Sequence, residues 1–575
     1  MKNSYRCRVL GRLLFWMVMI LPMAIQAQQF GQQAPEEKEL APVSRTYAIT
    51  NATITQAPGR KLTQATLVIK DGLISAVGKN VSIPADAVII KGDSLHLYAG
   101  FIDGLSRVGV NKPKEDANRE RPKDPGNPSP EVAGITPEKD VRTVISPQEK
   151  SIEELRALGF TTAQVVPYGT MLPGSSAVIM LSGKTVDGMV LNGKSGLFAE
   201  LQGAQRVYPA TVIAVIAKFR ELYRQAIQAK NYETLYASNR SGLNRPTSDR
   251  ILEAFYPVID KKIPVIFEAD RYLETQRIMG LQNDFGFLLI LADVKEGWDA
   301  ISKIKTTNTK VFLSLDLPED KKDDKKESKD KKPEAKAEDT TLTPQEKEAL
   351  EKRKAEFLAR YAGQAAAFQK GGVTFGFSTL SAKSADIRAN LRRMIKAGLT
   401  EDQALAALTI SSAQLLGLSD RLGTLDNGKI ANLVISDRPY FHEKANVVYV
   451  FVDGTPYKYD PKETSKADNG KFDIVGTWTV TTQTADGKTE ETLTIKKEGK
   501  DLTGSLTGGK LTDAIPLERV ELNGPSLKYS YTVQMGGQSY KVDVQATVDA
   551  TSFKGTAQHG TTGTFAVEAK KEPNR

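Results

Sequence analysis

An alternation of short apolar strands with helices, between about residues 100 and 421, is the feature that most constrains the fold. Strands that alternate with helices over such a length typically form parallel βαβ units, and roughly 250 residues or more suit a (β/α)8 TIM-like barrel. A doubly wound sheet is the alternative, but the sequence has no glycine-rich nucleotide fingerprint. The predicted strands are 161–166, 263–267, 287–291 and 310–315, and the predicted helices include 151–158, 206–230, 343–368 and 404–418.

β-Structure is predicted on both sides of this region. Residues 44–99 contain short apolar alternations with a tight turn at Asp71-Gly72, and residues 422–460 return to short strands. Residues 470–575 are rich in Thr, Gly and Val with period-two alternation, which predicts an extra C-terminal antiparallel β-domain, a sandwich or a small barrel. The chain is therefore expected to be an α/β protein with additional β-sheet domains.

The N-terminus is typical of an exported protein. Residues 1–27 have a basic start, an apolar run and a small-residue end, which predicts a cleaved signal peptide, with an uncleaved anchor as the alternative. Residues 28–43 are predicted to be a disordered leader. We therefore expect a periplasmic or extracellular protein, and the apolar run is too short to leave an integral membrane segment in the mature chain.

The charge pattern gives no sign of a nucleic-acid partner. The net charge of +9 falls to +5 without the four basic residues of 1–27. Residues 319–339 contain 8 Lys against 9 acidic residues, so the segment 319–340 is predicted to be a flexible charged insertion rather than a basic patch.

Histidine and cysteine are scarce, and this limits the metal chemistry of the chain. The sequence contains three His and one Cys, and these residues lie in separate segments. A zinc site of the usual kind needs three or four such ligands close together. The residues are Cys7, His96, His442 and His559.

Several separate segments resemble the amidohydrolase superfamily, specifically the secreted imidazolonepropionase-like branch. The resemblance covers about residues 45–460, and its most specific part is the closing run from 397 to 434, which includes Leu422-Gly423-Thr424-Leu425-Asp426. The resemblance implies a (β/α)8 barrel flanked by a composite β-sandwich, built from residues before and after the barrel. The other matching segments are 47–78, Ala99-Gly100-Phe101-Ile102-Asp103, 174–178 and 263–267.

The same resemblance implies a catalytic metal, yet the ligand positions are changed. Family members use a divalent metal such as zinc, which activates water and polarises the scissile carbonyl. Leucine cannot coordinate a metal, and arginine stays protonated, so no metal or other cofactor is expected in this chain. The His-x-His positions hold Leu105 and Arg107, the next two His positions hold Glu268 and Ala292 or Asp293, and residues 377–380 contain no acid where the family has Asp.

Three functions remain open. The first is a metal-free pseudoenzyme that acts in binding or assembly, as a homo-oligomer or beside an active amidohydrolase relative. The second is a hydrolase for C–N bonds other than peptide bonds, such as those of cyclic amides, with a rebuilt carboxylate site. The third places the function in residues 470–575, where Trp478, Tyr529, Tyr531 and Tyr540 could line a pocket.

Charged residues near the predicted strand ends are the candidates for a site. The catalytic candidates are Glu268, Asp293 and Asp103, and the binding candidates are Asp270 and Asp316. Arg107 is a further binding candidate, because its guanidinium could replace the charge of the metal by pairing with Glu268 or Asp103.

Overall fold

The structure is a computed structural model that divides into two compact units, Met1–Tyr459 and Asp460–Arg575. It describes residues 46–572 except for 114–121, 183–184, 319–342, 460–473 and short gaps in the second unit at 485–486, 499–500, 510–512, 524–525, 536–537, 550 and 560–562. The predicted signal peptide (1–27), leader (28–43) and charged insertion (319–340) lie outside the described residues. No helix of the described part is long and apolar enough to cross a membrane.

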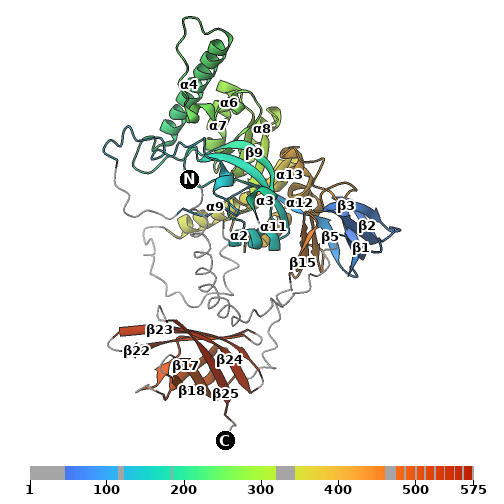
Figure 1. Cartoon of the computed structure of the whole chain (residues 1–575), viewed down its shortest axis with the longest axis vertical. Coiled ribbons are helices and arrows are strands. Elements are labelled where there is room, and N and C mark those ends of the chain that lie inside the picture. Colours follow the sequence, from blue (N-terminus) through green and yellow to red (C-terminus); the bar gives the residue numbers. More distant parts are fainter. Residues whose placement is uncertain are drawn as a thin grey trace, which may run out of the picture. The chain divides into compact units, whose positions relative to one another are not determined.

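The first sheet combines strands from both ends of the first unit. β14 pairs antiparallel with β5, with Leu433 opposite Ala99, so the chain after the helical region joins strands that precede it. Figure 1 shows β15 beside the blue strands of the N-terminal segment. Where the sequence predicts a two-part sandwich, the structure has one eight-stranded sheet. Its strands are β1(Thr46–Ala57), β2(Arg60–Lys70), β3(Leu73–Gly78), β4(Val88–Lys91), β5(His96–Ala99), β14(Leu433–Ser436), β15(Val447–Val452) and β16(Thr455–Lys458).

The second sheet has eight strands in the order β13-β12-β11-β10-β9-β8-β7-β6, and its two end strands contact each other. The backbone N–H of Thr379, directly after β13, donates to the carbonyl of Leu105 on β6 at 3.2 Å. The strands are β6(Phe101–Ser106), β7(Phe160–Val165), β8(Gly174–Met180), β9(Val190–Ala199), β10(Val265–Glu268), β11(Leu289–Val294), β12(Lys310–Ser314) and β13(Phe375–Ser378).

This sheet is not the regular (β/α)8 barrel that the sequence predicts. β8 runs antiparallel to both β7 and β9, whereas the other neighbouring pairs in the order are parallel. The connection from β7 to β8, residues 166–173, contains no helix. A parallel return needs a crossover of about a dozen residues or more, so this short connection forces β8 to run in the opposite direction.

Helices fill most of the remaining connections. The predicted helix 206–230 begins later, at Val212, where the side chain of Thr211 caps the first turn, and the predicted helix 404–418 is two helices that break at Thr409. The helices are η2(Val141–Thr143), α2(Lys150–Ala157), α3(Val186–Met189), α4(Val212–Ser238), α5(Arg250–Glu253), α6(Tyr256–Ile259), α7(Tyr272–Phe285), η3(Trp298–Ala300), α8(Ile301–Thr306), α9(Pro344–Ala362), α10(Gln364–Lys370), α11(Ile387–Lys396), α12(Glu401–Leu408) and α13(Ile410–Leu415).

Apolar side chains fill the interior enclosed by the second sheet. Phe312 is fully buried there, between Gly104 on β6 and Gly376 on β13. A Cβ atom at Gly104 would lie 1.9 Å from the Phe312 ring, and one at Gly376 would lie 2.6 Å from it. The two glycines therefore make room for an aromatic ring beside the contact of β6 with β13. The cluster consists of Leu105, Val166, Phe198, Ile266, Ile290, Ala292, Phe312 and Leu415.

The second unit is a nine-stranded antiparallel sheet in which the first and last strands, β17 and β25, are paired. Its core contains the fully buried Trp478 together with Tyr529, Tyr531 and Phe553, and Tyr540 packs against it. The aromatic residues that the sequence offered as pocket residues thus belong to the core. The strands are β17(Gly476–Thr484), β18(Gly487–Glu498), β19(Asp501–Thr507), β20(Ile515–Pro516), β21(Arg519–Asn523), β22(Ser526–Met535), β23(Gln538–Val548), β24(Ser552–His559) and β25(Gly563–Lys571).

Candidate functional site

Charged side chains gather where the parallel strands of the second sheet end. In sheets and barrels of this kind, the carboxyl ends of parallel strands bring loop residues to one end of the fold. Sequence reasoning named most of these residues and missed Glu200 and Lys295. The group comprises Arg107 after β6, Glu200 after β9, Glu268 and Asp270 at β10, Asp293 and Lys295 at β11, and Asp316 after β12.

Arg107 forms a largely buried ion pair with Glu200. Its Nη2 donates to Oε1 of Glu200 at 2.6 Å, and the two side chains are 22% and 8% exposed. The guanidinium carbon also lies 5.1 Å from the centroid of the Tyr168 ring. The ion-pair partner is therefore Glu200 and not Glu268 or Asp103, as the sequence suggested. Glu200 follows β9, the neighbour of β10, and so lies between Arg107 and Glu268.

Glu200 and Glu268 are neighbouring carboxyl groups, and each affects the pKa of the other. Burial, followed by the charges of Glu200 and Asp293, raises the pKa of Glu268 to about 8. Burial also raises the pKa of Glu200, although Arg107 opposes this rise. Near neutral pH, burial and the neighbouring carboxylates therefore favour the protonated form of Glu268, beside the carboxyl group that Arg107 holds.

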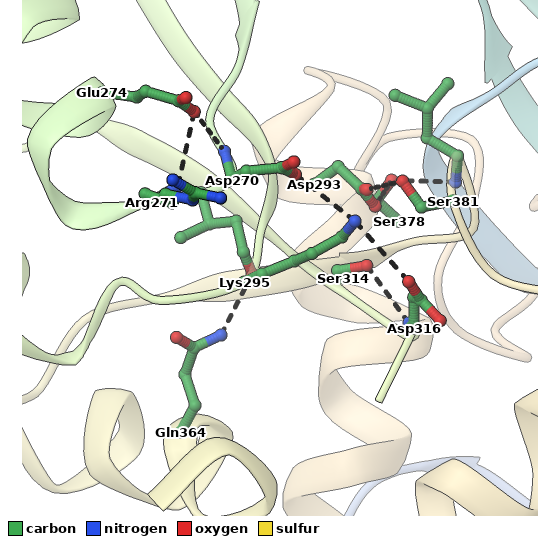
Figure 2. A network of polar contacts seen from close by, with 12 residues as sticks. Asp270, Arg271, Glu274, Asp293, Lys295, Ser314, Asp316, Gln364, Ser378 and Ser381 are labelled. Carbon is green, nitrogen blue, oxygen red and sulfur yellow. Dashed lines mark hydrogen bonds and ion pairs between the residues drawn. The ribbon is translucent and has the colours of Figure 1, made fainter. Parts of the chain in front are cut away.

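Lys295 lies among the remaining carboxylates (Figure 2). Its Nζ is 3.3 Å from Oδ1 of Asp270 and 3.5 Å from Oδ2 of Asp316, and its side chain is 18% exposed. Burial alone would lower the pKa of this ammonium, but the carboxylates of Asp270, Asp293 and Asp316 outweigh burial and raise it. Lys295 is thus a charged ammonium held at the end of the sheet.

Asp293 is fully buried at the end of β11 and has a left-handed backbone, with φ at 54°. Its carboxylate accepts hydrogen bonds from the hydroxyls of Ser378, at 2.9 Å, and Ser381, at 2.5 Å. Burial raises its pKa, against these hydrogen bonds and the charge of Lys295. Ser378, at the end of β13, and Ser381, after it, thus hold the Asp293 carboxylate in place.

Asp103 lies apart from this group, fully buried on β6. The backbone N–H groups of Leu105 and Thr379 donate to its Oδ1 at 3.2 and 3.0 Å, and the Thr379 hydroxyl donates to its Oδ2. Burial raises the pKa of Asp103 to about 7, although the hydrogen bonds from Thr379 act in the opposite direction. In this position Asp103 ties β6 to the residue after β13 and does not line any of the described cavities.

Two small cavities border the Arg107–Glu200 pair. One, of about 290 Å³, is lined by Glu200, Glu268, Asp270 and Glu274 among others. The other, of about 300 Å³, is lined by Arg107, Ser106, Tyr168 and Thr379 among others. The largest cavity described, about 1070 Å³, touches Tyr168 but none of the clustered carboxylates. The small cavities are therefore the spaces in which a ligand would meet the charged groups.

Comparisons with known proteins bear on the fold. Residues 358–458 match the model of the amidohydrolase family. A crystal structure of an amidohydrolase from Thermotoga maritima MSB8 is 21% identical, with a TM-score of 0.57, and the match covers 72% of this chain and 100% of that chain. The chain has an amidohydrolase fold.

Two other solved structures are less similar to this chain than the amidohydrolase from Thermotoga maritima MSB8 is. A prolidase complexed with N-methylphosphonate-L-proline is 15% identical, with a TM-score of 0.42, over 72% of this chain and 100% of that chain. Phenylurea hydrolase B is 14% identical, with a TM-score of 0.43, over 72% and 96%. No curated protein matches the sequence.

The residues at the sheet end do not fit the zinc-type centre that the amidohydrolase resemblance implies. Leu105, at a ligand position, belongs to the buried apolar interior. Glu268, Asp270 and Asp293 each offer one oxygen within 4.8 Å of the others, but oxygen ligands alone suit Mg²⁺ or Ca²⁺ rather than zinc. The histidines are elsewhere: His96 lies on β5, His442 follows β14, and His559 lies on β24 of the second unit.

Proposed function

We propose that this protein is a degenerate, metal-free amidohydrolase of the imidazolonepropionase-like branch that acts in binding or assembly. The observation that carries the proposal is the presence of two side-chain cations at the sheet end. Arg107 pairs with Glu200, and Lys295 pairs with Asp270 and Asp316. These two cations offset part of the negative charge of the carboxylates without a metal ion.

The proposal extends to location and partners. The signal-peptide pattern of residues 1–27 supports export to the periplasm or the extracellular space. The protein would assemble as a homo-oligomer or beside an active amidohydrolase relative. Sedimentation of the mature chain, alone and mixed with such a relative, tests this part: a monomer under both conditions would contradict it.

Metal analysis of the mature chain tests the proposal most directly. The protein, purified without residues 1–27, should contain far less than one equivalent of zinc or manganese by inductively coupled plasma measurement. It should also leave a panel of cyclic amides and peptides intact, with an active amidohydrolase as the positive control. Stoichiometric metal, together with hydrolysis that a chelator abolishes, would refute the proposal.

One observation favours a second function, hydrolysis of C–N bonds other than peptide bonds by carboxyl groups alone. The pKa of Glu268 is raised to about 8, Glu200 is paired with Arg107, and both line the 290 Å³ cavity. An ionised and a protonated carboxyl group side by side can serve as general base and general acid. The carboxylate would take a proton from water as the water oxygen attacks the carbonyl carbon, and the acid would protonate the leaving nitrogen.

The variant Glu268→Gln tests this alternative. It should abolish any hydrolysis of the cyclic-amide panel, because the amide cannot transfer the proton. Glu274→Gln is the matched control: Glu274 lines the same cavity, but its carboxylate accepts from the backbone N–H groups of Asp270 and Arg271. Equal rates in Glu268→Gln and the wild type would exclude the carboxyl mechanism.

A further inference from the structure

A large cavity of about 1070 Å³ lies beside the Arg107 pair, at Tyr168, and it touches none of the clustered carboxylates. We infer that this cavity is a docking site for an extended, acidic segment of a partner protein. The inference deepens the proposed binding role, on which it rests, because it names the chemistry of the partner.

Three segments form the walls of the cavity: the one after β6, the loop between β7 and β8, and the one after β9. Backbone hydrogen bonds join each segment to the other two. The cavity is therefore preformed, as binding pockets usually are, and is not a gap between independent loops. The three bonds run from the N–H of Thr136 to the carbonyl of Leu172 (2.8 Å), from Met171 to Gln202 (2.8 Å) and from Tyr208 to Pro125 (2.9 Å).

The lining of the cavity has an excess of positive charge. It includes Lys112, Lys139 and Arg206 but only one acid, Glu131. Glu131 is occupied by Lys139, whose Nζ lies 3.2 Å from its Oε1. Lys112 and Arg206 are exposed and have no ion-pair partner within the part of the chain that the structure describes. A partner with carboxylates at matching positions would supply the missing counter-charges.

Arg206 has a strained backbone that its own contacts do not explain. Its φ is 64°, in the left-handed region that residues with a side chain rarely adopt. The next residue, Val207, is 6% exposed and lines the same cavity, so the chain is anchored directly after the strained position. Strain of this kind is concentrated at binding sites. It supports a role for the Arg206 side chain in binding rather than in folding.

The size and the apolar part of the lining favour a peptide over a small anion. Pockets for small ligands have volumes of roughly 300–1,000 Å³, so this cavity has room for several residues. A small inorganic anion would leave most of the space and the apolar surface unused. The apolar and aromatic lining residues include Pro122, Pro125, Val132, Tyr168, Pro173 and Val207.

Selection from a random hexapeptide library tests the inference on the immobilised mature chain. The peptides have blocked termini, so only their side chains are charged. Bound peptides should be enriched in Asp and Glu over the input. A synthetic copy of the most enriched peptide should bind about tenfold more weakly to Lys112→Gln with Arg206→Gln, because two partly exposed ion pairs are lost. Added NaCl should also weaken binding to the wild type, since salt screens such pairs.

Lys123→Gln is the matched control. Lys123 is exposed and lies in the same segment as Pro122 and Pro125, but it does not line the cavity. Its replacement should leave the affinity for the peptide unchanged. Arg206→Lys keeps the charge and should retain most of the affinity, which separates loss of charge from damage to the loop.

Three results would overturn the assignment of the cavity. The first is a bound set with no enrichment of acidic residues, and the second is selection of the same acidic peptides by the double variant. The third is tighter binding of an oligothymidylate of equal charge that the double variant loses, which would indicate a nucleic acid. Failure of the proposed function is distinguishable, because metal-dependent amide hydrolysis by a chain that still selects acidic peptides would refute the metal-free role alone.

Discussion

Among single residues, Arg107 is the counter-ion of the buried Glu200 carboxylate. Arg107→Met would leave the Glu200 carboxylate, 8% exposed, without its cation. An unpaired buried charge of this kind costs about 3–5 kcal/mol, so we expect a loss of that size in the free energy of unfolding, measured with urea at pH 7. Arg107→Met with Glu200→Gln should recover most of it, because the amide needs no counter-ion. A single-variant loss below about 1 kcal/mol would contradict the importance of the pair.

Asp103 should make stability depend on pH. Burial raises its pKa from 3.8 to about 7 in the folded state, so folding favours the protonated form. Its contribution is therefore complete below about pH 4 and is lost as the pH rises towards 7, by about 4 kcal/mol in total.

Asp103→Asn tests this dependence, because the amide does not titrate. Unfolding free energies of the wild type and the variant, measured from pH 4 to pH 8, should diverge, with the wild type losing more stability as the pH rises. Parallel curves would show that Asp103 does not titrate in this range. Asparagine can still accept from the backbone N–H of Thr379, which now donates to Oδ1 of Asp103 at 3.0 Å.

Much of the candidate site could be predicted from residue types at the ends of the predicted strands. Which of these side chains form ion pairs with one another could not be predicted. Strand ends pointed to Glu268 and Asp293, and the altered family motif pointed to Arg107. Glu200 and Lys295 also follow strands by one residue, yet charged residues after strands are common, and loops decide which of them meet. Asp103 has the same chemistry as the other candidates, but its neighbours on β6 direct it to backbone donors.

Among the elements, β8 shows where sequence patterns mislead. In the sequence, residues 174–178 are only one of the segments that match the family, and this resemblance implies a strand there but not its direction. Direction depends on the length of the connection from β7, which is too short for a crossover helix. The family resemblance suggested a regular parallel barrel, and the short connection is the evidence in the sequence that opposed it.

The contact between β6 and β13 depends on the small size of Gly104. Gly104→Ala would place a methyl group 1.9 Å from the Phe312 ring, so the ring or the strand would have to move. Overpacking of a core typically costs about 1–3 kcal/mol, and we expect at least that loss in urea unfolding. Phe312→Leu in the same chain should relieve part of it.

A helical glycine provides the control for this substitution. At Gly280 on α7 a methyl group would meet no atom within 4 Å. Gly280→Ala should therefore be neutral or stabilise by roughly 0.5–1 kcal/mol. Equal effects of the two substitutions would mean that the close approach to Phe312 does not matter.

For the whole molecule, we predict that the two units fold independently. Each has its own core, with Trp478 at the centre of the second. Residues 470–575, expressed alone, should give a β-type circular dichroism spectrum and a cooperative melt, and calorimetry of the mature chain should resolve two transitions. A single transition in the mature chain, together with an unfolded fragment, would show that the second unit needs the first.

The two side-chain cations at the sheet end also predict how the whole chain responds to metal removal. A protein stabilised by a divalent ion at about 100 times its dissociation constant loses about 2.7 kcal/mol when a chelator removes the ion. Here Lys295 and Arg107 are covalent parts of the chain and cannot be extracted. The melting temperature of the mature wild type should therefore be the same with and without EDTA. A marked drop in the wild type would mean that a metal does bind, and the carboxylates around Lys295 would then be the first place to look for it.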